Sequence, residues 1–500
     1  MPKLRFWPLL GGFLFALLCY FPLFLHLDSL SLRLWDESRR GVNALEMATN
    51  GHWLVPHFAG APDMWGTKPP LLIWLQATFM KIVGYNELAV RLPSALAALA
   101  TVFLLIWFAK RLLNRPLAGY LAGLVLLTSD IYIESHGAIS GDYDTLLALW
   151  QTAYLFTFYR YLEDRQPKLL YLTGLFIFLA AFTKGIAGLF FLPALVVYAI
   201  FRKEFLPLLK NKSTYWTLLG VLIPLLGYYF LREAVNPGYL QAVWENELGG
   251  RYFEAKEGQE QPWWFYFRMI FKYELFSPWA YWIPVAFLIG FLTKKLQHIT
   301  LLLALNFVLF FTLISFAKTK LTWYFMPILP GLSLLVGLLI AEVYEAVRTH
   351  LQLSRPWLRN ALLMVMMLTI FTLPYSRIIQ KVYVFEHEGY LKEKMDYRDF
   401  MQKIPEEKQY SILHPYYNGH VVFYQALYNL RGYQIQDKML HAPQEGVLPE
   451  NPETPPTFQQ GEKVMLCETE PWQYLSSNYA WEIQREWKGC KLILVKGVRE

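Results

Sequence analysis

Long apolar runs separated by short polar segments occupy the first three quarters of the chain. A helix needs about 20 mainly apolar residues to cross a bilayer. Eleven runs are close to that length, and we expect about 11–13 transmembrane helices in all. The runs are 6–26, 87–109, 116–134, 144–162, 168–183, 185–201, 213–232, 274–293, 299–316, 322–346 and 360–375. The first has no small-residue cleavage site after it, so we expect a retained anchor rather than a signal peptide.

The basic residues between these runs predict the orientation of the chain. If the spans alternate, every short basic cluster falls on one side, and cytoplasmic loops are the ones enriched in Lys and Arg. The clusters are Lys110-Arg111-Arg115, Arg160-Arg165-Lys168, Arg202-Lys203-Lys210-Lys212, Lys294-Lys295 and Arg348-Arg355-Arg359. We therefore expect a cytoplasmic N-terminus, with the loops 28–86 and 233–273 and all residues after 375 on the outer side.

The outer loop 28–86 contains two half-apolar stretches, 38–49 and 70–83, that are too short to span a membrane. They predict amphipathic helices at the outer membrane surface.

Composition divides the chain into two domains. Apolar residues make up 55% of the sequence and charged residues 17%. Asp, Glu, Lys and Arg number 53 in residues 1–375 and 32 in residues 376–500, so charge is nearly twice as dense in the last quarter. We predict an α-helical polytopic membrane domain over 1–375, including both outer loops, and a small soluble extracytoplasmic α/β domain over 376–500. Disordered, fibrous and wholly cytosolic proteins are excluded.

The net charge of +7 does not indicate nucleic-acid binding, because the basic residues form short clusters between apolar runs. Two readings stay open for Cys467 and Cys490, which lie in short strand-like runs. They form a disulfide in an oxidising compartment, or they are two buried free thiols.

Charged residues at membrane level cost on the order of 2.5–3.5 kcal/mol near a helix centre, so they need partners or a function. The outer side collects six polar groups, which are Asp36-Glu37-Ser38-Arg39, Gly66-Thr67-Lys68, Ser140-Gly141-Asp142-Tyr143-Asp144, Thr183-Lys184-Gly185, the segment 244–252 and the segment 315–324. Together they predict a cationic cavity with carboxylates at the outer surface, which suits a substrate with an anionic head and a lipid tail.

Each group also has a structural explanation. Asp36 and Glu37 favour the positive end of a helix that begins there, and for Asp142 we favour a helix cap. Lys68 and Lys184 are also placed to reach lipid headgroups. Lys318 and Lys320 break the positive-inside pattern, because they lie on the outer side between two apolar spans, and this favours a functional reading for them.

The first outer loop resembles that of the dolichyl-phosphate-mannose:protein mannosyltransferase superfamily, and in particular the bacterial aminoarabinose transferases that modify lipid A. The resemblance covers roughly residues 1–345. It rests on Asp36-Glu37-Ser38-Arg39, Glu46, the segment 51–58 (GHWLVPHF), Lys68-Pro69-Pro70, Asp144, Thr183-Lys184-Gly185, Glu247, Arg251-Tyr252, the segment 262–266 (PWWFY), Pro278-Trp279 and the segment 315–330. It implies a GT-C glycosyltransferase with its active site on the outer face.

The resemblance also implies roles for single residues. Asp36 matches the essential acidic position and is the expected proton acceptor, and Glu37 beside it orients a neighbour or helps to hold an ion. The positions around the lipid phosphate of the donor are Lys68, Arg251, Lys318, Lys320 and Tyr324. Acceptor-side or secondary positions are Arg39, His57, Asp144 and Glu247. No cofactor is certain, and a divalent cation near Asp36 and Glu37 is left open.

We therefore expect a glycosyltransferase that moves a sugar from a polyprenyl-phosphate donor to a hydroxyl or phosphate of an envelope acceptor, with inversion. The acceptor is a lipid A-like glycolipid, another glycan or a protein, on the periplasmic face of a bacterial inner membrane. The chain has Thr67 and Leu248 where the aminoarabinose branch has Glu and His, so the sugar stays open.

The alternative function is a lipid-linked sugar transporter or flippase. A transporter is expected to carry charges deeper within its spans and to consist of related halves. Here the charges collect on one face and no halves match. A third reading, an envelope scaffold acting through residues 376–500, is the least supported, because that segment has no recognisable catalytic set.

Overall fold

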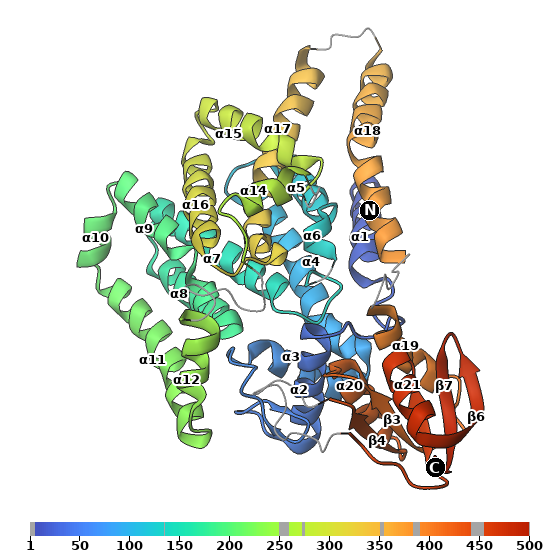
Figure 1. Cartoon of the computed structure of the whole chain (residues 1–500). Helices are drawn as coiled ribbons and strands as arrows, with labels where there is room; N and C mark the ends of the chain where they lie inside the picture. The colour runs from blue at the N-terminus through green and yellow to red at the C-terminus, as the bar shows by residue number, and fades with distance from the viewer. Residues whose placement is uncertain are drawn as a thin grey trace, which may run out of the picture. The chain divides into compact units, whose positions relative to one another are not determined.

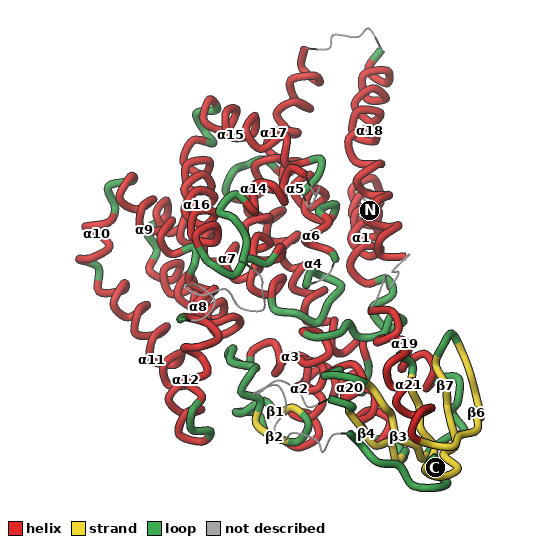
Figure 2. Tube along the Cα trace, in the orientation of Figure 1, coloured by secondary structure: helices red, strands yellow, loops and turns green. Residues whose placement is uncertain are grey.

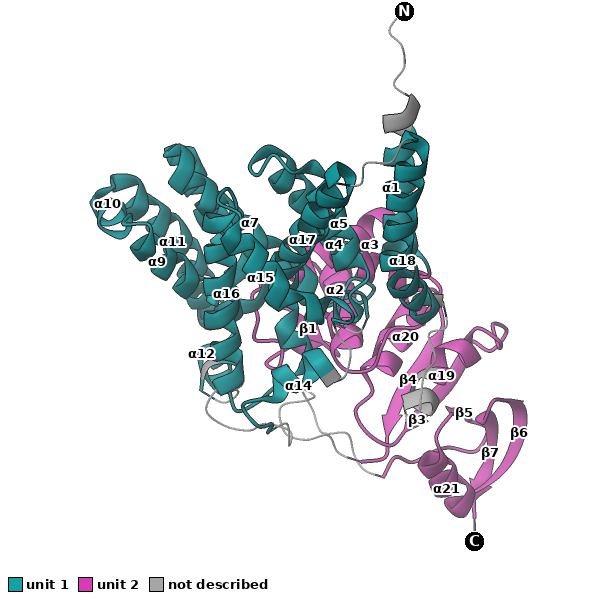
Figure 3. Cartoon of the chain, turned by 90° about the horizontal axis from the view of Figure 1, so that it is seen from above, with its two compact units in different colours: residues 1–25, 93–384 teal, residues 26–92, 385–500 magenta. Residues whose placement is uncertain are grey.

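The computed structural model describes residues 6–134, 136–249, 260–272, 276–350, 355–383, 391–441 and 455–499. The described chain is mostly helical, with one larger sheet near the C-terminus (Figures 1 and 2). Contacts within the chain group it into two compact units (Figure 3). Unit 1 comprises 1–25 and 93–384, and unit 2 comprises 26–92 and 385–500.

The described part of unit 1 is helical. Its longer helices are α1 (Phe6–Phe24), α4 (Glu87–Arg111, which begins in unit 2), α5 (Pro116–Leu127), α7 (Asp144–Asp164), α8 (Pro167–Lys184), α9 (Leu192–Phe201), α11 (Lys212–Val235), α15 (Ile283–Leu292), α16 (Gln297–Phe316), α17 (Leu329–His350) and α18 (Pro356–Tyr383). Its shorter ones are α6 (Asp130–Ile133), η1 (Gly185–Leu189), α10 (Phe205–Lys210), α12 (Tyr239–Val243), η2 (Trp244–Leu248), α14 (Phe265–Lys272), η3 (Trp279–Trp282) and η4 (Thr322–Ile328).

Every apolar run in the sequence coincides with one or two of these helices, which confirms the predicted polytopic helical fold. By length and apolarity, six described segments are able to cross a membrane. They are Glu87–Arg111, Pro167–Leu189, Lys212–Val235, Gln297–Phe316, Thr322–His350 and Pro356–Val382. Five further apolar helices have 10–17 residues, so the number of spans stays a prediction.

The helix ends follow local sequence signals. Proline occupies the first turn of α5, α8 and α9, where its missing N–H removes no helical hydrogen bond. The α11 helix begins after Asn211, whose side chain accepts a hydrogen bond from the backbone N–H of Ser213.

Helix α17 lies in the most buried of the six described candidate membrane spans. Of the 18 most apolar consecutive residues in this span, 94% are buried, compared with 22% in the spans that contain α11 and α18. Gly337 allows α17 to approach α5 closely, because a Cβ atom there would lie 2.6 Å from the backbone nitrogen of Ala122. Small residues permit such contacts between membrane helices. The apolar surfaces that α11 and α18 expose suit contact with lipid.

Unit 2 contains a five-stranded mixed sheet in the order β4-β3-β5-β7-β6. The strands are β3 (Gln409–His414), β4 (Gln434–Met439), β5 (Lys463–Leu466), β6 (Tyr479–Trp487) and β7 (Cys490–Val498). Strand β3 pairs in parallel with β4 and β5, and β7 pairs antiparallel with β5 and β6. The helices of the unit are α2 (Asp36–Asn50), α3 (Leu71–Val83), α19 (Leu391–Met401), α20 (Gly419–Asn429) and α21 (Thr469–Asn478), and a hairpin joins β1 (His57–Phe58) to β2 (Ala61–Pro62). Helices α2 and α3 confirm the helices predicted over 38–49 and 70–83.

The first outer loop and the C-terminal segment share one hydrophobic core. Leu32, Val42 and Phe58 from the loop belong to the same buried cluster as Ile412 and Phe423. Polar contacts accompany this packing, since the Tyr424 hydroxyl accepts a hydrogen bond from the Leu32 N–H (3.0 Å) and donates one to Glu87 (2.9 Å). The predicted α/β character of the C-terminal segment is confirmed. The predicted division into membrane and soluble residues at 375 stays a prediction.

Cys467 directly follows β5 and Cys490 begins β7, and a disulfide joins them. Of the two readings left open by the sequence, the structure therefore has the disulfide. Cys19 is a buried free cysteine in α1.

Candidate active site

Asp36 is the first residue of α2 and lies in the part of unit 2 richest in buried charge. Its carboxylate pairs with Arg40 one helical turn later (2.7 Å), and 39% of its side chain remains exposed. The side chains of Glu37 and Asp63, also in unit 2, are 1% and 0% exposed. Of these three carboxylates, Asp36 is therefore the one that a solvent-borne or membrane-borne substrate can reach.

Glu37 is buried and held in place by Arg91 of α4. The Arg91 Nε donates to Oε1 (2.7 Å), and the backbone N–H of Arg33 donates to Oε2 (2.7 Å). Burial opposes ionisation, but Arg91 and Arg33 together hold the pKa of the Glu37 carboxyl below its usual range. Glu37 is thus an anion with both oxygens occupied, which favours the predicted orienting role over the predicted ion-holding role.

Arg39 and Asp63 form a second buried pair. Two guanidinium nitrogens of Arg39 bind the two carboxylate oxygens, at 3.0 Å for Nε and 2.6 Å for NH2. The Asn43 amide adds a third hydrogen bond (3.0 Å). Burial raises the pKa of Asp63, but Arg39 and the hydrogen-bond donors outweigh this effect and lower it to about 2. The predicted secondary residue Arg39 therefore anchors a turn through this carboxylate.

The turn that Asp63 organises leads directly to Lys68. The Asp63 carboxylate accepts hydrogen bonds from the backbone N–H groups of Trp65 and Gly66, both at 3.0 Å. A Cβ atom at position 66 would lie 2.8 Å from the Asp63 Oδ2, so glycine there lets the turn approach the carboxylate without displacing it. Thr67 is buried and Lys68 half-buried. Asp63 thus fixes the backbone that carries the predicted phosphate-binding lysine.

The C-terminal segment contributes Tyr417 to this part of unit 2. Its ring lies 5.3 Å from that of Trp35 and 5.7 Å from that of Phe58, and the Arg39 guanidinium is 5.8 Å from it. Burial raises the pKa of Tyr417 to about 12, so its hydroxyl stays protonated at neutral pH. His57 binds the Val55 carbonyl through Nδ1 (2.8 Å), which fits a structural role for this ring.

In unit 1, Asp144 is the first residue of α7 and is buried. Lys184, the last residue of α8, binds its Oδ1 at 2.6 Å. The same ammonium lies 5.5 Å from the centre of the Tyr324 ring, and Tyr324 belongs to η4. The structure therefore brings together the predicted residues Asp144 and Tyr324 through Lys184.

Asp142 lies two residues before Asp144 and forms an ion pair with His136. The His136 ring stacks on Trp323, with 3.6 Å between centroids and 14° between planes. The predicted helix cap at Asp142 is wrong, because Tyr143 is the N-cap residue of α7 and makes no side-chain capping hydrogen bond. One oxygen of the Asp142 carboxylate pairs with the imidazole, and the other accepts a hydrogen bond from the Tyr143 backbone N–H at 2.7 Å.

The two outer lysines of the 315–324 segment differ in environment. Lys318 is exposed and pairs with Glu260 at 3.3 Å. Lys320 is buried and donates to the carbonyls of Ala317 (2.5 Å) and Gln261 (2.8 Å). Burial and the charge of Lys318 lower the pKa of Lys320. These contacts leave Lys318 more accessible than Lys320 to an incoming anion.

The second outer loop is described only in part. Glu247 is half-buried in η2. Arg251 lies outside the described residues, so its predicted role is left as a prediction.

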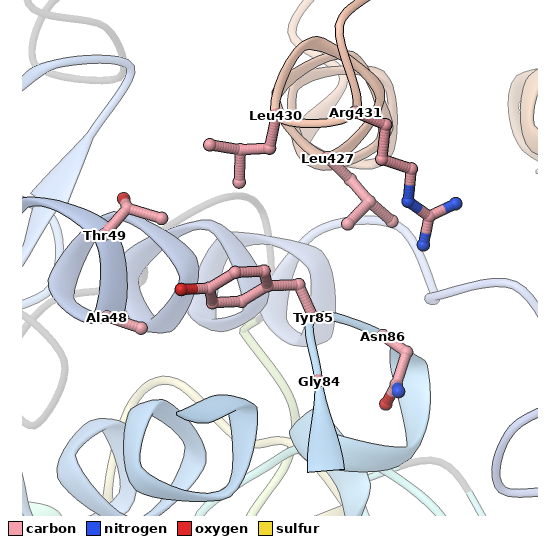
Figure 4. A pocket seen from close by; sticks show the side chains of 8 residues that line it. All are labelled: Ala48, Thr49, Gly84, Tyr85, Asn86, Leu427, Leu430 and Arg431. Atoms are coloured by element: carbon pink, nitrogen blue, oxygen red, sulfur yellow. The ribbon is translucent and has the colours of Figure 1, made fainter. Parts of the chain in front are cut away.

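A cavity of about 590 Å³ lies in unit 2 at the other end of α2 (Figure 4). Its walls include Thr49 of α2, Tyr85 before α4, and Leu430 and Arg431 after α20. A helix rises about 1.5 Å per residue, so Thr49 is about 20 Å from Asp36 along α2. This cavity is separate from the charged residues around Asp36.

Sequence reasoning missed Arg91, Asp63, His136 and Tyr417. A charge in the first turns of an apolar helix is a signal that could have found Arg91, because such a charge needs a partner. Asp63 lies in the segment APDMWG, and aspartate is common in ordinary turns, so its residue type gave no separate signal. The sequence around Tyr417 contains no signal that would separate it from the other tyrosines of the C-terminal segment.

Residues 67–229 match the family described as dolichyl-phosphate-mannose-protein mannosyltransferase. An undecaprenyl phosphate-alpha-4-amino-4-deoxy-L-arabinose arabinosyl transferase from Shewanella sediminis is 31% identical over 340 residues, which cover 65% of this chain and 60% of that protein. A protein of the same description from Pseudomonas fluorescens is 28% identical over 332 residues, covering 64% and 56%. The chain thus matches less than two thirds of the length of these relatives.

The fold resembles that of ArnT from Cupriavidus metallidurans bound to undecaprenyl phosphate. The TM-score is 0.67 at 16% identity, with 97% of this chain and 98% of that chain covered. The archaeal oligosaccharyltransferase AglB from Archaeoglobus fulgidus gives a TM-score of 0.51 at 14% identity, covering 86% and 64%. Taken together, these matches confirm the predicted resemblance to the dolichyl-phosphate-mannose:protein mannosyltransferase superfamily, and the chain is a multi-pass membrane protein with a GT-C fold.

Proposed function

We propose that the chain is an integral-membrane glycosyltransferase that moves a sugar from a polyprenyl-phosphate donor to a hydroxyl or phosphate of an envelope acceptor. The acceptor is a lipid A-like glycolipid, another glycan or a protein. The names of the two relatives and of the undecaprenyl phosphate-bound structure support the donor class.

One observation carries this proposal. In a loop dense in buried charge, Glu37 and Asp63 are locked by arginines, while Asp36 keeps 39% of its side chain exposed. A general base must reach the proton that it removes. The two ion pairs hold Glu37 and Arg39, which follow Asp36 along α2, and the accessible carboxylate is the one that the resemblance assigns as proton acceptor.

The proposed reaction is a direct displacement. The acceptor oxygen attacks the anomeric carbon of the donor sugar, and Asp36 accepts the proton of that oxygen when it is a hydroxyl. The bond between the anomeric carbon and the phosphate oxygen breaks at the same time, so the configuration inverts. The leaving group is a polyprenyl phosphate anion, which needs charge neutralisation more than protonation.

Cationic side chains supply that neutralisation in the proposal. Lys68, Arg251, Lys318 and Lys320 are the candidates, with Tyr324 as a hydrogen-bond donor. Lys320 already donates to two backbone carbonyls and is more buried than Lys318. We therefore assign Lys318 the earlier contact with an approaching phosphate and Lys320 a supporting position.

We also propose the bacterial inner membrane as the location, with residues 376–500 on the periplasmic side. The two relatives are bacterial. The Cys467–Cys490 disulfide supports an oxidising compartment for the C-terminal segment, since disulfides are rare in the cytosol. The one-sided basic clusters of the sequence support a cytoplasmic N-terminus.

The proposal is tested with purified protein in nanodiscs and a panel of polyprenyl-phosphate sugars, beginning with undecaprenyl phosphate aminoarabinose. Release of free polyprenyl phosphate is followed with and without an envelope glycolipid fraction. Asp36→Asn is compared with Asp28→Asn, because Asp28 is an exposed carboxylate of the same loop. We expect acceptor-dependent release that Asp36→Asn abolishes and Asp28→Asn retains.

Two results would overturn this assignment. Normal turnover by Asp36→Asn would remove Asp36 as the base. Movement of intact donor across the membrane of reconstituted vesicles, without release of polyprenyl phosphate from any donor, would replace the transferase with the transporter.

A further inference from the structure

A cavity of about 1270 Å³ lies on the C-terminal sheet of unit 2. It is formed by the beginnings of β3, β4 and β5 and by the segment 457–463 that leads into β5. All its lining residues come from 407–463, so it contains none of the residues assigned to the proposed reaction. We call it the sheet groove.

The strands that line the sheet groove have one apolar and one polar face. Tyr410, Ile412 and Ile435 pack into the core shared with α20. On the opposite face, Gln409 is opposite Gln434, and Ser411 is opposite Gln436. Parallel strands are usually covered and apolar on both faces. Here the second face of β3 and β4 is polar where it lines the sheet groove.

The same face becomes apolar further along the sheet, where a helix covers it. Leu413, Val464 and Ile493 form a buried cluster with Leu475 of α21. The polar side chains are therefore confined to the part of the face that borders the sheet groove. This distribution is expected if the polar part of the face is solvated and binds a ligand. It is not expected if that part belonged to the hydrophobic core.

Five charged side chains line the sheet groove, and four of them form two ion pairs, while the fifth, Lys408, is exposed. Lys438 pairs with Glu462 at 2.7 Å, and Lys463 pairs with Glu407. Glu462 also accepts hydrogen bonds from the Ser411 hydroxyl and the Gln459 N–H. A phosphate or a carboxylate would therefore meet two closed ion pairs and one lysine rather than a cluster of cations, so the lining better suits a ligand without net charge.

Exposed amides supply the remaining polar groups of the sheet groove. These are Gln409, Gln434, Gln436, Gln459 and Gln460. Within the ranges that the structure describes, their side-chain amides make no hydrogen bond to another protein group. Each amide offers two donors and one acceptor oxygen. Neighbouring strands lie about 4.8 Å apart, so amides at paired positions are spaced to bind successive hydroxyl groups.

An aromatic ring completes the wall. The Tyr433 hydroxyl donates to the Pro405 carbonyl at 3.0 Å, and its ring meets Tyr428 edge-on with centroids 5.0 Å apart. These contacts fix the ring in one position. A fixed tyrosine beside amides gives an apolar surface for the C–H face of a sugar next to donors and acceptors for its hydroxyls.

We propose that the sheet groove binds a neutral, hydroxyl-rich glycan of several sugar units. Its volume exceeds the roughly 300–1,000 Å³ of a small-molecule pocket, which favours an oligosaccharide over a single sugar. The proposal goes beyond the transferase function, because no bond is broken in the sheet groove and binding requires no donor.

The test measures glycan binding by the full chain in lipid nanodiscs, free of maltoside or glucoside detergents that would compete. The probes are maltotriose, N,N′-diacetylchitobiose and a neutral mannotriose, with inorganic phosphate as the charged comparison. Saturation-transfer NMR detects binding, and a titration gives the dissociation constant. The variant is Gln434→Ala/Gln436→Ala on the edge strand β4, and the matched control is Gln473→Ala, an exposed glutamine of α21 outside the sheet groove.

We expect at least one saccharide to bind the wild-type chain and Gln473→Ala equally, and the double variant at least tenfold more weakly. The thermal unfolding temperature of the double variant should match the wild type, which separates lost binding from lost folding. Absence of saccharide binding, equal binding to the double variant, or binding of phosphate alone overturns the proposal. The binding measurement contains no polyprenyl-phosphate donor. Its outcome therefore does not depend on whether the chain is active as a transferase.

Discussion

Arg91 binds both carboxylate oxygens of Glu37, with its Nε 2.7 Å from Oε1 and its NH2 3.1 Å from Oε2. The same guanidinium donates to the carbonyls of Leu27 (3.0 Å), Leu30 and Ser31 (both 2.7 Å). One side chain at the start of α4 therefore ties together the segment that precedes α2. This pair is 54 residues apart in sequence, and it sets the backbone from which the candidate base projects.

Arg91→Ala should lower the free energy of unfolding by roughly 3–5 kcal/mol, because it leaves the buried Glu37 carboxylate without its partner. The measurement is thermal or denaturant unfolding in a mild detergent. Arg348→Ala is the control, because Arg348 and Glu345 form an exposed pair whose loss should cost less than about 1 kcal/mol. Equal effects of the two substitutions would contradict a structural role for the Glu37–Arg91 pair.

The stability of unit 2 should fall steeply in acid through Asp63. A carboxyl whose folded pKa is below its unfolded value stabilises the fold above the unfolded pKa, and this contribution is lost as the pH falls through the folded pKa. The pKa of Asp63 is lowered from 3.8 to about 2, which corresponds to about 2 kcal/mol. The difference in unfolding free energy between wild type and Asp63→Asn should therefore shrink between about pH 4 and pH 2. A difference that is constant from pH 7 to pH 2 would contradict this assignment.

Lys68→Ala should weaken binding of the polyprenyl-phosphate donor by at least about tenfold. A hydrogen bond from a charged group contributes about 1.5–3 kcal/mol, and a tenfold change in affinity corresponds to about 1.4 kcal/mol. The dissociation constant is measured in nanodiscs with undecaprenyl phosphate. Lys81→Ala serves as the control, because Lys81 is an exposed lysine of α3 that lies 5.3 Å from the Trp53 ring. Unchanged donor affinity in Lys68→Ala would remove Lys68 from the phosphate site.

Thiol labelling should report the Cys467–Cys490 disulfide directly. The chain has three cysteines, and Cys19 is the free one. Denatured protein should therefore take up one alkyl group before reduction and three after it, as counted by intact mass. Reduction should also destabilise the C-terminal segment by about 3 kcal/mol, given a sequence separation of 23 residues. Three reactive thiols without reduction, in protein purified in the absence of reducing agents, would contradict the pairing.

Local sequence was sufficient to predict most elements of the fold. The apolar run 299–316 became α16, and the half-apolar stretch 70–83 became α3, because the length and spacing of apolar residues act within a single helix. The α/β character of the C-terminal segment was readable for the same reason, whereas the orientation inferred from the basic clusters stays a prediction. Asp36, Lys68 and Asp144 could be singled out because charge beside an apolar span is costly.

The pairing of these residues could not be predicted in this way. Asp142 read as a helix cap, but the fold of unit 1 brings His136 to its carboxylate. Lys184 read as a headgroup anchor, but α7 and α8 bring it to Asp144. Lys184 and Asp144 are 40 residues apart and meet because α7 and α8 pack together, whereas His136 reaches Asp142 within one loop whose conformation the apolar pattern does not specify.

The sequence by itself determined that this protein is a polytopic helical membrane protein whose charged residues lie mainly in the segments between and after its apolar runs. Only the tertiary structure decided which carboxylates are locked and which is accessible. Arg91, Asp63 and Tyr417 meet the α2 charges after long stretches of chain have folded back, and Tyr424 meets Leu32 across 392 residues. Hydrophobic patterning acts within a turn or two of helix, whereas the choice of an electrostatic partner depends on which distant segments share a core.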